Sequence, residues 1–146
     1  MKITNDAQMV IYRQEGRNIF FLLLCRFNPE RGVDEYRLVK GGVEKDESIE
    51  NAAKREIEEE VGLKDAQIIL KVHEYSYTAG EIHHNVQVLL VKTLGENIDI
   101  DSSEEGKFEI KGYRWELTEK ALDLLSYEDE KKSIINSLEK INLYNQ

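Results

Sequence analysis

The chain has 146 residues, enough for one hydrophobic core and too few for two of ordinary size, so we expect a single domain over residues 1–146. Hydrophobic residues make up 40% of it and charged residues 34%, a balance typical of globular proteins and unlike that of disordered chains. The formal net charge of −9 argues against extended nucleic-acid binding, because phosphate backbones attract basic surfaces. A small polyanion can still bind where metal ions or a few basic side chains reverse the local field.

Three features of the sequence favour the cytoplasm over a membrane or an export route. No apolar run approaches the roughly 18 residues that span a bilayer, and the N-terminal segment MKITNDAQMV lacks the apolar centre of a signal peptide. Cys25 is the only cysteine, so the chain forms no internal disulfide. We therefore expect a cytoplasmic protein with no membrane partner.

The first part of the chain predicts β-structure that leads into a glycine loop. Residues 7–13 and 18–27 are rich in aliphatic and aromatic side chains and are separated by a turn with a glycine, which predicts a hairpin. The second run is apolar at successive positions, as in a strand covered on both faces. Residues 28–34 contain the only proline and predict a loop, and residues 36–40 predict a short strand that ends at Gly41.

The stretch after Gly41 predicts a short helix whose inward side carries acids. At the helical period, five apolar side chains form one arc: Ile49, Ala52, Ala53, Ile57 and Val61. Glu56 and Glu60 fall inside this arc, and Glu59 falls at its edge. Carboxylates at this spacing repel one another, and burying an unpaired one costs more still, so we expect a cation beside them.

The type of ligand indicates which cation this is. No Cys or His accompanies the acidic cluster, and oxygen ligands favour Mg²⁺ or Mn²⁺ over zinc. The helix also carries boundary signals, because Asp46 or Ser48 can cap its N-terminus and Gly62, followed by Leu63, can end it. The three histidines of the chain lack the spacing of a zinc site within one element.

The rest of the chain predicts more strands and then a pair of helices. We expect strands at residues 66–77, 86–93 and 108–117, with loops at 78–84 and 94–107 between them. We expect helices at residues 119–125 and 129–142, the second with an apolar stripe. Buried strands around a carboxylate helix, followed by a terminal helix pair, predict an α/β fold with a mixed sheet between helices.

The glycine loop and the acidic helix together resemble a known signature. Gly41 is followed after five residues by Glu47, and after seven more by residues 55–63, which read REIEEEVGL. This pattern resembles the signature of the Nudix hydrolases at every fixed position. The resemblance implies the Nudix α/β/α sandwich, with a mixed β-sheet between helices, and hydrolysis of a nucleoside diphosphate linked to another group. Val39 is a departure, because the family often has proline there.

The resemblance also implies roles for residues of the signature. Glu56, Glu59 and Glu60, the acids already expected to hold Mg²⁺ or Mn²⁺, would be the catalytic metal ligands, and the carbonyl of Gly41 would join them. Glu47 and Arg55 would pair and hold the loop against the helix.

Residues outside the signature complete the expected site. Nudix enzymes often add a carboxylate six residues before a tryptophan, which here is Glu109, counted from Trp115; Glu104 and Glu105 are its rivals. Lys40 resembles the lysine of the diadenosine polyphosphate hydrolase branch, and Tyr127 lies where that branch places an aromatic that stacks on adenine. With Arg37, these two are the expected substrate-binding residues.

The substrate and the oligomeric state stay open. The leading expectation is a dinucleoside polyphosphate, although Gln87 stands where that branch often has an aromatic residue. The alternatives are a nucleoside triphosphate, a sugar nucleotide such as ADP-ribose, and an RNA end, which the acidic net charge disfavours. A different class of function is a module that binds a nucleotide and regulates a partner without catalysis. A homodimer is compatible with the sequence.

Overall fold

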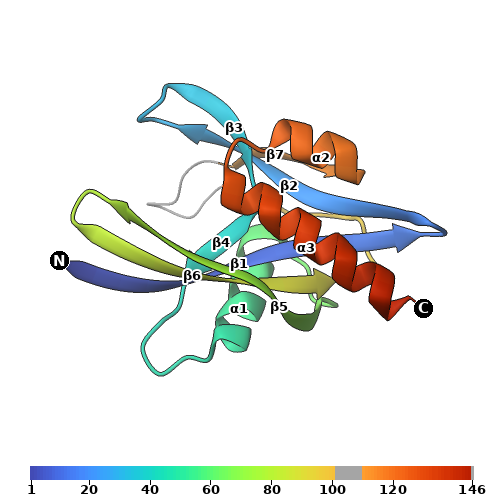
Figure 1. Cartoon of the computed structure of the whole chain (residues 1–146), viewed down its shortest axis with the longest axis horizontal. Coiled ribbons are helices and arrows are strands. Elements are labelled where there is room, and N and C mark those ends of the chain that lie inside the picture. The colour runs from blue at the N-terminus through green and yellow to red at the C-terminus, as the bar shows by residue number, and fades with distance from the viewer. Residues whose placement is uncertain (101–109, 146) are drawn as a thin grey trace.

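The sheet is built around β1 (Lys2–Glu15), which pairs along both of its edges. The computed structural model describes residues 1–100 and 110–145. On one edge, β1 pairs in parallel with β6 (Ile82–Lys92). On the other edge it pairs antiparallel with β4 (Val39–Gly42) and, further along, with β2 (Asn18–Asn28). The parallel and antiparallel pairs confirm the predicted mixed sheet (Figure 1).

Three more strands extend this centre. β5 (Gln67–Ala79) pairs antiparallel with β6, while β3 (Val33–Arg37) and β7 (Ile110–Glu116) both pair antiparallel with β2. The sheet therefore has the strand order β3-β2-β1-β6-β5, with β4 attached to β1 and β7 attached to β2.

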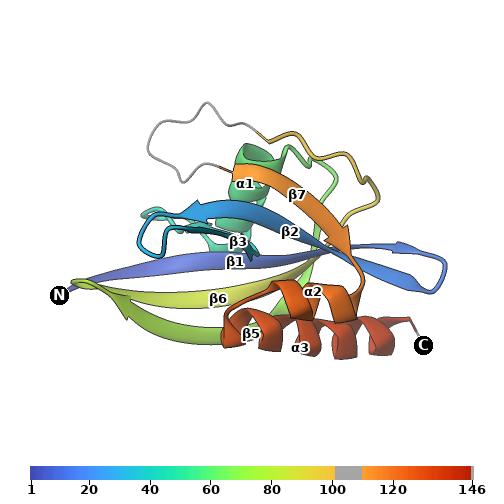
Figure 2. The ribbon, with the colours of Figure 1, turned by 90° about the horizontal axis from the view of Figure 1, so that it is seen from above.

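Helices cover both faces of the sheet (Figure 2). α1 (Ile49–Val61) lies on one face, and α2 (Thr118–Leu124) and α3 (Glu128–Tyr144) lie on the other. Neighbouring residues of a strand point to opposite faces. Met9 of β1 accordingly joins the buried cluster under α1, and Val10 joins the cluster under α2 and α3. The result is the α/β/α arrangement that the sequence predicts.

Two predicted boundaries are wrong, and strand pairing explains both. Residues 78–84 are not a loop, because β5 and β6 continue to a tight turn in which Thr78 pairs with His83 and Gly80 has a φ of 60°. Residues 36–40 are not one strand. The chain changes partner at the buried Leu38, since β3 pairs with β2 and β4 pairs with β1.

The two predicted C-terminal helices are present as α2 and α3, with slightly different ends. Within the described residues, none of the helices combines the length and the apolar character needed to cross a membrane.

Candidate active site

α1 begins and ends at residues that the sequence marks. Ser48 is the N-cap, and its side chain accepts a hydrogen bond from the backbone nitrogen of Asn51 at 3.1 Å. Gly62 ends the helix in the left-handed region, with a φ of 69°. Asp46, the other candidate cap, instead lies in the preceding loop with a φ of 64°. These ends set the rotation of the helix, and therefore which side chains face the sheet.

The acids of α1 lie where the helical period predicts them. Glu56 is 5% exposed and Glu60 is 4% exposed, so both are buried against the sheet beside apolar neighbours. The side chain of Glu59 is 38% exposed, which agrees with its predicted place at the edge of the arc. Burying carboxylates is unfavourable unless positive charge compensates them.

Arg55 supplies part of that positive charge and binds the loop to the helix. Its Nε and Nη2 donate to the two oxygens of Glu47 at 2.9 and 2.8 Å, and its Nη2 also donates to the carbonyl of Gly42 at 2.9 Å. Its Nη1 donates to Glu56 at 2.7 Å and lies 3.5 Å from Glu59. The expected pairing of Glu47 with Arg55 is therefore present as a two-pronged hydrogen bond.

This arrangement shifts the pKa values of both partners. The hydrogen bond from Arg55, helped by one from the backbone nitrogen of Glu44, lowers the pKa of Glu47 to about 2. The hydrogen bond to Glu47, followed by the interaction with Glu56, raises the pKa of Arg55. Both groups are therefore charged at neutral pH.

Gly41 lies directly against the side chain of Glu56. A Cβ atom built at Gly41 would overlap the Cγ, Cδ and Oε2 atoms of Glu56, whereas one built at Gly42 would meet nothing within 4 Å. Only glycine at position 41 therefore lets the loop approach the acidic helix this closely.

Arg26 also supplies positive charge to this cluster, and sequence reasoning missed it. Its Nη2 donates to Oε2 of Glu60 at 2.8 Å. The sequence does offer a weak signal, because Arg26 is a cation at the end of the apolar run of β2. Its partner is 34 residues away, however, and the register of β2 against β7 shifts between Cys25 and Arg26, so alternation along the strand does not predict where it points.

The oxygen atoms gathered around α1 are of the type that binds a hard divalent cation. They belong to two buried carboxylates, one half-exposed carboxylate and a glycine backbone that lies against one of them. Within residues 1–100 and 110–145, no three Asp, Glu, His or Cys side chains converge as a closed metal site would. The carboxylates instead contact the guanidinium groups of Arg26 and Arg55.

A cavity of about 540 Å³ is lined by residues of β2 to β5 and of the start of α3, and it brings the expected substrate-binding residues together. Arg37, Lys40 and Tyr127 all line it, although they come from β3, β4 and the residue before α3. Arg26 lines it too. Because Arg26 also contacts Glu60, one side chain connects the cavity with the acids of α1.

Two tyrosines of this cavity are held by polar partners. The hydroxyl of Tyr127 donates to Glu35 at 3.0 Å, and the guanidinium of Arg37 lies 4.2 Å from the centre of its ring. The hydroxyl of Tyr77 contacts Nζ of Lys40, and that nitrogen lies 3.7 Å from a carboxylate oxygen of Asp6. Tyr77 was missed by sequence reasoning, because it lies 37 residues from Lys40 and nothing in the strand pattern marks it.

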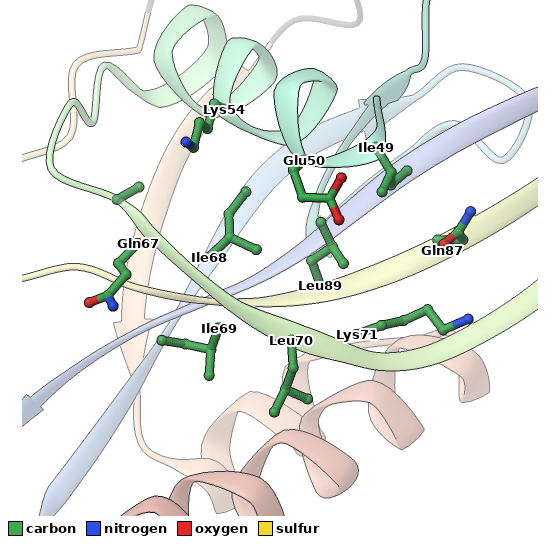
Figure 3. A pocket seen from close by; sticks show the side chains of 11 residues that line it. Ile49, Glu50, Lys54, Gln67, Ile68, Ile69, Leu70, Lys71, Gln87 and Leu89 are labelled. Atoms are coloured by element: carbon green, nitrogen blue, oxygen red, sulfur yellow. The ribbon is translucent and has the colours of Figure 1, made fainter. Parts of the chain in front are cut away.

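A second cavity, of about 510 Å³, lies between α1 and β5 (Figure 3). Ile49, Glu50 and Lys54 of α1 face residues of β5 across it, and Leu89 of β6 lines it as well. None of the described residues that the sequence predicts for the site lines this cavity. Glu109, the expected extra carboxylate, and its rivals Glu104 and Glu105 lie outside the described residues.

Solved structures with the same fold extend over nearly the whole chain. A C. elegans Ap4A hydrolase in a binary complex has 22% identity and a TM-score of 0.78, with 98% of this chain and 99% of that chain covered. An E. coli dihydroneopterin triphosphate pyrophosphohydrolase has 18% identity and a TM-score of 0.71, with 92% and 95% covered. The Nudix domain of Shewanella oneidensis NrtR, complexed with ADP ribose, has 15% identity and a TM-score of 0.74, with 97% and 90% covered.

At these identities the structures show a shared fold and leave the substrate open. No curated protein matches the chain. The family model of the NUDIX domain matches residues 3–138, and this span contains the glycine loop, α1 and every described residue of the site. The chain therefore belongs to the Nudix family.

Proposed function

We propose that this chain hydrolyses dinucleoside polyphosphates with the help of Mg²⁺ or Mn²⁺ held by Glu56, Glu59, Glu60 and the carbonyl of Gly41. The observation that carries the proposal is the cavity, which brings Arg37, Lys40 and Tyr127 to one place and shares Arg26 with the acidic helix through its contact with Glu60. Nudix hydrolases in general depend on divalent metals, and the oxygen donors of α1 are of the type that these metals prefer. A bound divalent ion neutralises phosphate oxygens and acidifies water.

Two kinds of side chain in the cavity suit the two parts of such a substrate. Lys40, Arg37 and Arg26 offer positive charge to the phosphate chain. Tyr127 and Tyr77 supply aromatic rings for contact with a nucleobase. Arg37 already lies against the first ring, and His84 stacks on the second with 4.5 Å between the ring centres. A volume of about 540 Å³ is within the range of pockets that enclose small ligands.

The remaining residues of the site have positioning and proton-transfer roles in this proposal. Arg55 and Glu47 fix the loop, so that the backbone of Gly41 stays against Glu56. Hydrolysis forms a bond from the oxygen of water to phosphorus and breaks the bond from that phosphorus to the bridging oxygen, which leaves with the other phosphate. It also needs a base for the proton of the water. The half-exposed Glu59 and the carboxylate of Glu109 are the two candidates for this base.

A panel assay tests the proposed substrate. Diadenosine tetraphosphate, ATP and ADP-ribose are each incubated with the enzyme and Mg²⁺, and the products are separated by chromatography. We expect kcat/KM to be highest for diadenosine tetraphosphate. A rate for it no higher than that for ATP would overturn the assignment and leave the triphosphates as the substrate class.

A pair of variants on α1 tests whether the chain is a catalyst or only binds nucleotides. Glu59→Gln should lower kcat by about 100- to 1000-fold, the size expected when one group that stabilises a transition state is lost. Glu58→Gln is the matched control, since Glu58 is the exposed neighbour on the same helix and the charge change is identical. Equal rates for the two variants would exclude a catalytic role for Glu59, and a wild type without turnover would favour a binding module over a catalyst.

A further inference from the structure

A buried acid on α3 holds the arginine of the substrate cavity. Glu130 is 1% exposed, and both of its oxygens lie 3.1 Å from Nε of Arg37. Arg37 belongs to β3, 93 residues earlier in the chain, and its side chain is 26% exposed where it lines the cavity. One end of this arginine is therefore anchored in the protein interior while the rest reaches the cavity.

Glu130 is itself held in place from β1 and β5. Nε2 of Gln8 donates to Oε2 of Glu130 at 2.9 Å, and the hydroxyl of Tyr75 donates to Oε1 of Gln8 at 2.6 Å. Gln8 is fully buried. The chain of contacts thus runs from Tyr75, which lines the cavity, through the buried Gln8 and Glu130 to Arg37, and the proposed reaction assigns no role to Tyr75, Gln8 or Glu130.

These contacts limit the positions that Arg37 can adopt. Its Nε faces Glu130, its Nη1 lies 3.4 Å from Glu35, and its guanidinium plane lies over the ring of Tyr127. Burial lowers the pKa of Arg37, but the charge of Glu130 and the hydrogen bonds to it outweigh this effect, and the pKa is raised overall. The group is thus kept both charged and oriented.

Orientation matters because a long side chain loses rotamer freedom when it binds a ligand. An arginine that is already fixed before the ligand arrives loses less, so the ligand binds more tightly. A buried acid that fixes an arginine in this way acts on affinity, whereas an acid that only holds α3 on the sheet acts on stability.

We propose that Glu130 is a positioning residue for substrate binding, which holds Arg37 in the orientation that receives the polyphosphate chain of a nucleotide. This inference rests on the proposed function. Glu130 would then influence KM through Arg37, because its oxygens bind Arg37 and Gln8.

Steady-state kinetics of Glu130→Gln, Arg37→Lys and the double variant test the proposal, with diadenosine tetraphosphate as substrate. Glu130→Gln keeps the volume of the buried side chain and removes its charge, while Arg37→Lys keeps the charge of the arginine and removes the Nε contact. We expect each single variant to raise KM about tenfold, as for other residues that orient a binding group, and to change kcat less than about twofold. The double variant should be no worse than either single variant, because both break the same contact.

Ser133→Ala supplies the control for stability. Ser133 is also fully buried on α3, one turn further along, where its hydroxyl donates to the carbonyl of Asp129. It should lower the melting temperature without changing KM. If Glu130→Gln behaves like this control, or if the effects of the single variants on KM multiply, then Glu130 only supports the fold and the proposal is wrong. A wild-type enzyme that turns over no nucleotide of the panel would instead remove the proposed function itself.

Discussion

Arg55 and Glu47 form the contact that holds the glycine loop on the acidic helix. The pKa of Glu47 is lowered to about 2 from its ordinary value of 4.5. A lowered pKa means that the ionised form is favoured in the folded state, so the stability from this contact is present above pH 4.5 and is lost as the pH falls towards 2. We predict that Glu47→Gln is less stable than the wild type at pH 7, and that the difference narrows below pH 4.5.

Urea unfolding at pH 7, 5, 4 and 3 measures this difference. Glu44→Gln is the control, because the side chain of Glu44 is 70% exposed and lies 3.9 Å from Arg55. A gap between the wild type and Glu47→Gln that stays constant over this range would show that the ionised carboxylate contributes nothing to stability.

Gly41 and Gly42 are neighbours, but only Gly41 lacks room for a Cβ atom. A Cβ at Gly41 would overlap Glu56, so Gly41→Ala must displace either the loop or α1, and we predict a loss of about 1–3 kcal/mol in unfolding free energy. Gly42→Ala should be close to neutral, because a Cβ there meets nothing within 4 Å. Denaturant midpoints of the two variants test the prediction, and equal midpoints would contradict the close approach of loop and helix.

At the level of single residues, the sequence predicts the site only where the information is local. Glu56, Glu59 and Glu60 could be placed because the helical period alone determines which side they occupy. Arg26 and Tyr77 could not, since each acquires its partner only when distant strands come together. Glu130 could not be predicted either, because its partner Arg37 is 93 residues away in the sequence.

α1 is the element whose boundaries were easiest to predict, and the reason is chemical. The side chain of Ser48 accepts a hydrogen bond from the backbone nitrogen of Asn51, which has no partner within the helix. We predict that Ser48→Ala lowers the free energy of unfolding by about 1 kcal/mol. Ser48→Asp should keep most of it, because an aspartate also accepts this hydrogen bond. Thermal unfolding compares the two variants. If Ser48→Ala and Ser48→Asp lose the same amount of stability, the loss does not come from the capping hydrogen bond.

The turn between β5 and β6 shows why other boundaries could not be predicted. Residues 78–84 contain glycine and polar side chains, which by themselves predict a loop. In the fold, this part of β6 pairs with the N-terminal part of β1 on its other edge, and that pairing extends the strand. Strand order and strand ends depend on partners that pattern and propensity do not specify.

At the scale of the whole molecule, the described residues form two buried clusters on opposite faces of the sheet. Ile57 belongs to the cluster under α1 and Ile134 to the cluster under α3, and both are fully buried. We predict that Ile57→Val and Ile134→Val each cost about 0.5–1.5 kcal/mol, and that the double variant loses the sum of the two within about 0.5 kcal/mol. Urea unfolding followed by fluorescence and by circular dichroism tests this. Two separate transitions would mean that the clusters unfold independently and that residues 1–146 are not a single cooperative domain.

The parallel pairing of β1 with β6 has a consequence for how the protein is made. Lys2 is paired with Ile82 and Tyr12 with Lys92, so one edge of β1 finds its partner only after some 80 further residues have been synthesised. At about 5–20 residues per second this takes several seconds. During that interval the acidic helix has already been translated but has no complete sheet to cover its apolar side. The site can therefore form only late in synthesis, and a ribosome that stalls between residues 63 and 82 would release a product with the whole signature but without β6, the parallel partner of β1.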